Sequence, residues 1–196
     1  MSKKKIIILG AGGHANAVID VVEKTNKYSI YGIVDKKEKL KKKFGYKIIG
    51  SDEDLFNIRK KVSRALISIG QIKSNKPRIK IFQKLTKLSF SLDTIVSKNA
   101  YVSKRSNINY ATILMDNVHI GPDVNIGLNC IINTSSVIEH DSTIGNHTHI
   151  STGAIINGNV HVGNNVFIGS GCVVKNGITI SDNKVIPMGT IVKRNI

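Results

Sequence analysis

The stretch VIEHDSTIGNHTHISTGAII, residues 137–156, places an isoleucine at every sixth position, namely Ile138, Ile144, Ile150 and Ile156. The same period extends outward from this stretch in both directions, from Val96 to Val192, and all seventeen positions of the series are aliphatic. A strict period of six is typical of a β-helix, in which each rung is a short strand plus a turn and three rungs complete a triangular coil. The sequence therefore predicts an all-β parallel β-helix over residues 93–196, with aliphatic side chains stacked inside it about 4.8 Å apart.

The positions two residues before this series are restricted as well, to small or aliphatic side chains. Lys184 violates the pattern, and we expect the coil to fray or change there. Cys130 and Cys172 both fall at these inward positions, which favours small buried side chains over a nucleophile or a metal ligand. Two cysteines do not make a disulfide framework, which agrees with a reducing compartment and predicts a cytoplasmic protein.

Residues 1–92 show a different pattern, in which aliphatic strands alternate with helices. We expect strands at residues 6–9, 30–34 and 65–69, and helices that begin near residues 10–15, 52–54 and 77. The run of residues 6–9 is continuously aliphatic, as in a strand covered on both faces. Acidic residues suit a first helical turn, and proline can begin a helix. This alternation predicts an α/β module with a parallel sheet, equivalent to half of a Rossmann-like fold.

A glycine-rich segment follows the first expected strand. Gly10, Gly12 and Ala15 fit the pattern G-x-G-x-x-A, in which small residues let the backbone approach phosphate oxygens at a helix N-terminus. Asp35 lies near the position of a ribose-binding acid, and His14 at the helix mouth is either a helix-cap residue or a hydrogen-bond partner for a sugar or phosphate. A tight strand–helix turn that binds nothing is the alternative. Because the module has only about 90 residues, one nucleotide fits better than NAD.

Charge is concentrated in the first module. Residues 1–92 hold 22 Lys+Arg against 7 Asp+Glu, whereas residues 93–196 hold 7 against 6. The excess suggests an anionic partner such as a phosphate or a nucleotide, or else solvated lysine-rich faces. The densest run, residues 36–43, has no aromatic residues interleaved among its lysines, so we expect no nucleic-acid partner. No run approaches 18 consecutive apolar residues, so we expect no membrane insertion.

One histidine stands apart from the others of the repeat region. His140 lies two residues after the inward Ile138, in a turn where Asp141 is its neighbour, and an adjacent carboxylate can orient an imidazole that acts as a base. Four other histidines are interpreted as surface residues of outward positions: His119, His147, His149 and His161. A metal site built from residues 140, 147 and 149 has no support from ligand geometry, so we expect no metal.

These features together resemble a known family, the bacterial hexapeptide acyltransferases. It includes the sialic acid O-acetyltransferases and the N-acetyltransferases of nucleotide-linked 4-amino sugars. The resemblance covers both modules, and the residues that carry it are Ile8-Leu9-Gly10-Ala11-Gly12-Gly13-His14, Asp35, Gly70-Gln71, the seventeen rungs and Glu139-His140-Asp141. It implies that the α/β module is followed by a left-handed β-helix.

The resemblance also implies a reaction and its catalytic groups. His140 would be the general base that deprotonates a sugar amine or hydroxyl as it attacks the thioester of acetyl-CoA, and Asp141 would tune that histidine. Acetyl-CoA would lie in the groove between neighbouring β-helices of a homotrimer. Three residues match cofactor-contacting positions of the family, His149, Ser170 and Lys175, and Gly158 is the fourth residue assigned to the cofactor. Gly158 is one coil beyond His140, where its N–H can meet the developing oxyanion.

The acceptor is expected to bind to the α/β module, residues 1–92. The residues assigned to it are Gly12, Gly13, His14, Asp35 and Gly70. The first choice of acceptor is the amino group of a nucleotide-linked 4-amino-dideoxy sugar used in a bacterial surface glycan. The alternative is O-acetylation of sialic acid or a related sugar acid. A non-enzymatic nucleotide-binding scaffold and an oxidoreductase are hypotheses from other classes.

Overall fold

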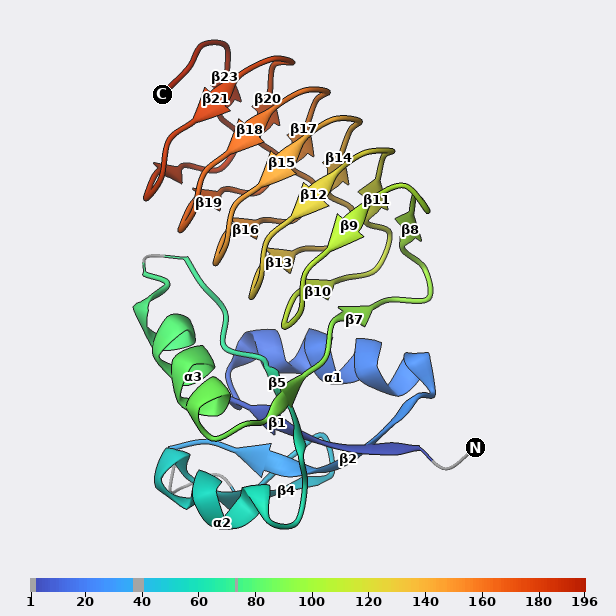
Figure 1. Cartoon of the computed structure of the whole chain (residues 1–196), viewed down its shortest axis with the longest axis vertical. Coiled ribbons are helices and arrows are strands. Elements are labelled where there is room, and N and C mark those ends of the chain that lie inside the picture. The colour runs from blue at the N-terminus through green and yellow to red at the C-terminus, as the bar shows by residue number, and fades with distance from the viewer. Residues whose placement is uncertain (1–2, 37–40, 73) are drawn as a thin grey trace. The chain divides into compact units, whose positions relative to one another are not determined.

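The computed structural model describes residues 3–36, 41–72 and 74–196 and divides the chain into two compact units, Met1–Asp93 and Thr94–Ile196 (Figure 1). Part of the lysine-rich run at residues 36–43 lies outside the described residues. No described helix combines the length and the apolar composition needed to cross a membrane.

The first unit contains a twisted sheet whose strand order is β3-β4-β2-β1-β5-β6. Its strands are β1 (Lys4–Leu9), β2 (Tyr28–Val34), β3 (Lys42–Lys43), β4 (Tyr46–Gly50), β5 (Arg64–Ile67) and β6 (Ser91–Leu92). All pairings are parallel except that between β3 and β4. Strand β1 lies in the interior of this order, between β2 and β5. Its aliphatic run Ile6–Leu9 is at most 1% exposed, as expected for a strand that is covered on both faces. The expected parallel α/β sheet is confirmed.

The helices of this unit begin where the sequence predicted. They are α1 (Gly13–Thr25), the short 3₁₀ helix η1 (Asp52–Asp54), α2 (Leu55–Arg59) and α3 (Lys76–Lys87). Pro77 lies in the first turn of α3, where its missing N–H costs no hydrogen bond. Ser51 and Asp54 form a capping box at η1, with the Ser51 N–H donating to the Asp54 carboxylate at 2.7 Å.

Polar contacts hold the end of the first unit. The Tyr28 hydroxyl donates to Asp93 at 3.0 Å, and the Arg64 guanidinium pairs with the other Asp93 oxygen at 2.7 Å. Burial, together with the Asp93 carboxylate, raises the pKa of Tyr28 to about 12. The phenol therefore stays protonated and remains a donor throughout the physiological range.

The second unit is a left-handed parallel β-helix built from two-residue strands, as its coils in Figure 1 show. One sheet contains β7 (Ile95–Val96), β10 (Ile113–Leu114), β13 (Ile131–Ile132), β16 (His149–Ile150), β19 (Phe167–Ile168) and β22 (Val185–Ile186). The second contains β8 (Tyr101–Val102), β11 (His119–Ile120), β14 (Val137–Ile138), β17 (Ile155–Ile156), β20 (Val173–Val174) and β23 (Ile191–Val192). The third contains β9 (Asn107–Ile108), β12 (Asn125–Ile126), β15 (Thr143–Ile144), β18 (His161–Val162) and β21 (Thr179–Ile180).

The aliphatic series forms the interior of this β-helix, as predicted. Ile138 and Ile156, for example, are fully buried and pair in register one coil apart. Cys130 and Cys172 are free thiols that are also fully buried, which confirms the prediction that both are small buried side chains at inward positions. The expected fraying at Lys184 is wrong. Strand β22 follows directly and pairs in register with β19, and the Lys184 carbonyl accepts a hydrogen bond from Phe167 at 2.9 Å, so the backbone ladder continues while the lysine side chain is exposed.

Inward serine and threonine residues fit the interior because their hydroxyls form hydrogen bonds with backbone carbonyl and N–H groups of the next coil. Thr112 donates to the Gly127 carbonyl at 2.9 Å and accepts from the Cys130 N–H at 3.0 Å. Ser142 repeats both contacts five rungs later, with Asn157 at 2.9 Å and Val160 at 3.1 Å. A buried hydroxyl that is fully hydrogen-bonded carries little desolvation penalty, so the pattern tolerates it.

We predict that Ile144→Ala destabilises the β-helix by about 2–5 kcal/mol, because Ile144 is 1% exposed and truncation leaves a cavity among the stacked residues. Thr143→Ala, at the outward position of the same strand β15, should change stability by less than about 0.5 kcal/mol. Urea unfolding followed by circular dichroism measures both. Equal midpoints for the two variants would contradict the inward assignment.

Candidate functional site

The turn between β14 and β15 presents His140 at one edge of the β-helix. Asp141 adopts a left-handed conformation with φ of 59°, which an aspartate tolerates in a turn. The backbone of this turn is tied to both neighbouring coils, since the Asp141 N–H donates to Pro122 at 3.1 Å and the His140 carbonyl accepts from Asn159 at 2.9 Å. The turn is therefore a rigid support for an exposed imidazole.

His140 and Asp141 form a hydrogen-bonded pair. The Nδ1 atom of His140 lies 2.7 Å from Oδ2 of Asp141, and the two side chains are 59% and 58% exposed. An ionised carboxylate only accepts hydrogen bonds, so the contact places the imidazole proton on Nδ1. Nε2 then carries the lone pair and is able to accept a proton from a substrate.

Gly158 lies against the Nε2 side of this imidazole. A Cβ atom built on Gly158 would be 2.6 Å from both Cε1 and Nε2 of His140, closer than any side chain permits. The absence of a side chain at this position therefore leaves room for the ring. Within the residues that the structure describes, the Gly158 N–H has no backbone acceptor, while its carbonyl accepts from Gly177 at 3.1 Å.

The other three expected cofactor residues lie farther from His140. Lys175 is exposed on the same edge, two coils beyond Glu139. Ser170 lies on a different edge, where its hydroxyl is 2.9 Å from that of Ser151. His149 belongs to β16, in a different sheet from β14. Of the four, the structure brings Gly158 into contact with His140, and the assignment of the others stays a prediction.

The interpretation of His149 as a surface histidine is wrong. Its side chain is buried, its Nε2 lies 3.3 Å from the Asn133 amide nitrogen, and its ring meets the edge of Phe167 at 5.2 Å between centroids. His147 instead contacts the Asn129 amide at 3.0 Å. Among the described residues, no group of three or more histidine, cysteine, aspartate or glutamate side chains is arranged to hold a metal ion.

The first unit contains a cavity of about 780 Å³ at the carboxyl ends of β1, β2 and β5. All five expected substrate residues line it: Gly12, Gly13, His14, Asp35 and Gly70. The carboxyl ends of parallel strands are where α/β folds bind ligands. A Cβ atom on Gly70 would lie 3.4 Å from Cβ of His14, so these two chain segments approach closely at the cavity wall.

The glycine-rich turn is held in place by side chains from two neighbouring strands. Asp35 follows β2, and its Oδ2 accepts from the Ala11 N–H at 2.5 Å. Ser68 follows β5, and its hydroxyl lies 2.9 Å from the Leu9 carbonyl and 2.7 Å from that of Gly10. Asp35 therefore shapes the turn itself, a role that its spacing from Gly10 did not reveal.

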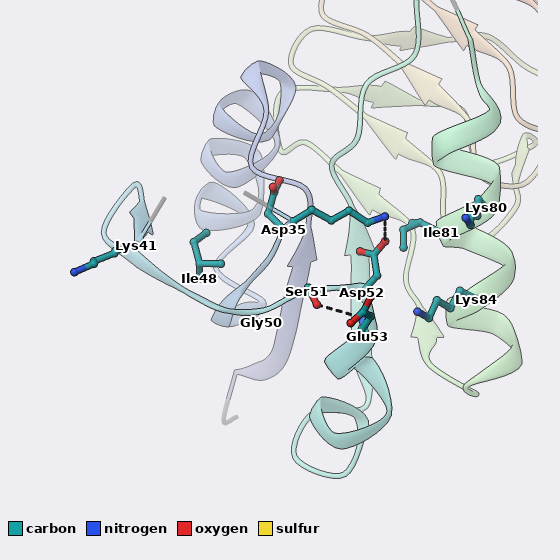
Figure 2. Close-up of a pocket in the computed structure, with 11 residues that line it drawn as sticks. Asp35, Lys41, Ile48, Gly50, Ser51, Asp52, Glu53, Lys80, Ile81 and Lys84 are labelled. Carbon is teal, nitrogen blue, oxygen red and sulfur yellow. Dashed lines mark hydrogen bonds and ion pairs between the residues drawn. The ribbon is translucent and has the colours of Figure 1, made fainter. Parts of the chain in front are cut away.

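A second cavity of about 830 Å³, whose lining is drawn in Figure 2, shares Asp35, Lys36, Asp52, Lys80 and Ile81 with the first, so the two adjoin. Four of its lining residues are lysines, namely Lys36, Lys41, Lys80 and Lys84. Sequence reasoning did not assign any of these, nor the acids Asp52 and Glu53. The available signals were the i, i+4 spacing of the two α3 lysines and the position of Lys36 next to Asp35.

Comparisons with known proteins agree with this architecture. A family model described as the PglD N-terminal domain matches residues 5–85. Models of the bacterial transferase hexapeptide and of the hexapeptide repeat of succinyl-transferase match residues 141–176 and residues 117–157 and 159–194. No match is found among curated proteins.

Solved structures match along the whole chain. A variant of perosamine N-acetyltransferase from Caulobacter crescentus, in complex with CoA and GDP-perosamine, is 30% identical with a TM-score of 0.93, covering 100% of this chain and 91% of the other. The acetyltransferase domain of PglB from Neisseria gonorrhoeae, in complex with acetyl coenzyme A, is 23% identical with a TM-score of 0.92, covering 100% and 93%. The latter similarity concerns the fold alone.

The chain therefore belongs to the family of hexapeptide-repeat sugar acetyltransferases that carry a PglD N-terminal domain, and it is an acyltransferase. The resemblance of the sequence to this family is confirmed.

We predict that Gly10→Ala destabilises the first unit by about 1–3 kcal/mol, because Gly10 has φ of 103° and an added Cβ would lie 2.8 Å from Cγ1 of Ile69. Gly12→Ala is the matched control. No heavy atom lies within 4 Å of its built Cβ and its φ is −70°, so its stability should change by less than about 1 kcal/mol. Thermal unfolding compares them, and a larger loss for Gly12→Ala would refute the assigned turn geometry.

Proposed function

We propose that this protein transfers an acetyl group from acetyl-CoA to the amino group of a nucleotide-linked 4-amino-dideoxy sugar, in the synthesis of a bacterial surface glycan. The observation that carries the proposal is the His140–Asp141 pair at 2.7 Å with its Nε2 against Gly158. Perosamine N-acetyltransferase, 30% identical over the whole chain and solved with CoA and GDP-perosamine, supports the same reaction class.

The chemistry is a direct transfer in a ternary complex. His140 Nε2 takes a proton from the sugar ammonium, and the free amine attacks the thioester carbonyl. A C–N bond forms and the C–S bond breaks, and the nitrogen loses its second proton as the amide forms. Of the two protons lost by the nitrogen, one converts the leaving CoA thiolate into the thiol and the other is released to solvent. Asp141 keeps the imidazole in the tautomer that this step needs and stabilises the imidazolium that it produces. No acyl-enzyme is required, because Cys130 and Cys172 are buried.

Acetyl-CoA is the proposed co-substrate. The Gly158 N–H faces no other backbone acceptor in the described chain and would donate to the thioester oxygen as negative charge develops there. Contacts of CoA with His149, Ser170 and Lys175 remain part of the proposal. Because these residues lie on different edges and sheets of one β-helix, a single CoA would contact them from two subunits.

A homotrimer is part of the same proposal. The sheet that contains β14 presents mainly apolar side chains outward, with His119 as the polar exception, whereas the sheet that contains β15 presents asparagine, threonine and histidine. Three exposed members of the apolar face are Tyr101, Ile155 and Ile191, which are 59%, 36% and 62% exposed. Contiguous exposed apolar surface of this kind marks protein interfaces. His140 lies at the edge between the two sheets, next to such an interface.

The acceptor would bind in the cavities of the first unit. The N-terminus of α1 begins at Gly13 with the open backbone of Gly12 before it, which suits a phosphate. Lys36 and Lys80 line both cavities and supply positive charge for a diphosphate. The same charge suits the carboxylate of a sugar acid, so O-acetylation of sialic acid is the second candidate. A cytoplasmic location stays a prediction.

The reaction is tested by measuring thiol release from acetyl-CoA with a panel of nucleotide-linked 4-amino sugars and sialic acids. We expect release with a nucleotide-linked amino sugar and an N-acetylated product by mass spectrometry. Release with sialic acids alone would select the second candidate. No release with any acceptor, together with tight nucleotide binding, would leave a binding scaffold instead of an enzyme.

We predict that His140→Ala lowers kcat by about 10²–10⁴-fold, the usual effect of removing a general base. The variant should keep its fold because the His140 side chain is exposed. His161→Ala, which removes another exposed histidine from the neighbouring sheet, should leave kcat unchanged. Steady-state kinetics at saturating acetyl-CoA measure both, and near-normal turnover of His140→Ala would eliminate the proposed base.

We also predict that Gly158→Ala lowers kcat by at least about tenfold, since its methyl group would displace an imidazole that now lies 2.6 Å from that position. Gly153→Ala is the control, because a Cβ atom built on Gly153 has no heavy atom within 4 Å. Its φ of 65° predicts some loss of stability on substitution but no loss of kcat. Activity is compared at a temperature where circular dichroism shows all proteins folded. Full activity of Gly158→Ala would refute the close approach.

A further inference from the structure

The two adjoining cavities of the first unit have different chemistry at their ends. The cavity near the glycine-rich turn offers backbone N–H groups at the start of α1, which suit phosphate. The adjoining cavity extends past β2 to the end of β4 and the start of η1, where Gly50, Ser51, Asp52 and Glu53 line it. A nucleotide whose phosphates bind at the first end has room for its nucleobase at the second.

Asp52 and Lys36 form a pair at the junction of the two cavities. Lys36 Nζ lies 3.7 Å from Asp52 Oδ2, and the Asp52 side chain is only 25% exposed (Figure 2). The capping of η1 does not use Asp52, because Asp54 accepts both from the Ser51 N–H at 2.7 Å and from the Ser51 hydroxyl at 3.1 Å. The Asp52 carboxylate and the Lys36 ammonium are therefore available to a ligand side by side.

We propose that this pair reads guanine, so that the acceptor is a GDP-linked sugar. The inference rests on the proposed function and extends it to the choice of nucleobase. The Watson–Crick edge of guanine presents an acceptor, O6, followed by two donors, N1–H and the N2 amino group. A lysine donor beside a two-oxygen carboxylate acceptor matches these three groups in order.

The other bases match this pair less well. Uracil and thymine present an acceptor, a donor and a second acceptor, so their O2 faces a carboxylate oxygen without a proton between them. Adenine and cytosine both place an amino donor against the lysine and a ring-nitrogen acceptor against the carboxylate. Leaving such groups unpaired or opposed in a partly buried site is costly, which is how hydrogen-bonding sites reject analogues.

Apolar surface for the ring is present in the same cavity. Ile48 from β4 and Ile81 from α3 both line it together with Asp52 (Figure 2). Lys80, one residue before Ile81, lines both cavities and lies where it can serve the phosphates between the base and the sugar. Asp35 is less suited to reading the base, since one of its oxygens already accepts the Ala11 N–H.

The test measures dissociation constants of the full-length protein for GDP, IDP and UDP by isothermal titration calorimetry. IDP keeps O6 and N1–H but lacks the N2 amino group. We expect GDP to bind about tenfold or more tightly than UDP and several-fold more tightly than IDP, as for a bidentate contact with a base. Such an order requires an acceptor opposite the N2 amino group.

Asp52→Asn tests the assignment to this residue. An asparagine amide accepts with one atom and donates with the other, so it opposes one of the two guanine donors but suits the donor–acceptor pair N3–H and O2 of uracil. We expect GDP affinity to fall about tenfold or more, UDP affinity to stay or rise, and the GDP–IDP difference to disappear. Asp20→Asn, which removes a carboxylate from the exposed face of α1, should keep the wild-type order.

The outcomes separate this inference from the proposed function. A preference for UDP over GDP, an Asp52→Asn variant with the wild-type order, or a loss of preference in Glu53→Gln instead would overturn the reading of guanine by Asp52. Each of these leaves a nucleotide-binding acetyltransferase intact. The absence of binding by all three nucleotides would instead contradict the proposed acceptor site itself.

Discussion

The parallel pairing of each rung with the rung 18 residues later is the constraint on which the β-helix depends. Ile138 pairs with Ile120 on one side and with Ile156 on the other, and the rungs between the two end coils are paired on both sides in this way. Residues separated by 18 therefore stack on one edge about 4.8 Å apart. This stacking brings Gly158 against the imidazole of His140, so the repeat that stabilises the fold also builds the proposed catalytic edge.

The first unit depends on a different constraint, the strained glycine-rich turn between β1 and α1. Its glycine-rich turn has φ of 103° at Gly10 and needs external support, which Asp35 and Ser68 supply through the Ala11 N–H and the Leu9 and Gly10 carbonyls. Asp35 thereby has a structural role as well as a place in the cavity wall. The carboxylate that we propose for recognition of the base, Asp52, lies just after β4 and is not used by the helix cap.

Most of the fold could be predicted from the sequence because its patterns are long or strongly aliphatic. The period of six located every strand from β7 to β23, and the continuous run at Ile6–Leu9 located the central strand of the sheet. Strands β3, β4 and β6 were not predicted, since they are short and mostly polar or half-exposed at the edges of their sheet. Lys184 was misjudged because a backbone ladder does not need the side chain of each residue to be buried.

The sequence by itself determined the two units, the inward stack and the identity of His140 and Asp141 as neighbours, because all of these are local or periodic properties of the chain. The tertiary structure decided which distant residues of the first unit meet: Ala11 with Asp35, and Lys36 with Asp52. These contacts depend on how strands are ordered and how side chains pack across them. No periodicity records that information, because it arises only when segments far apart in the chain share one surface.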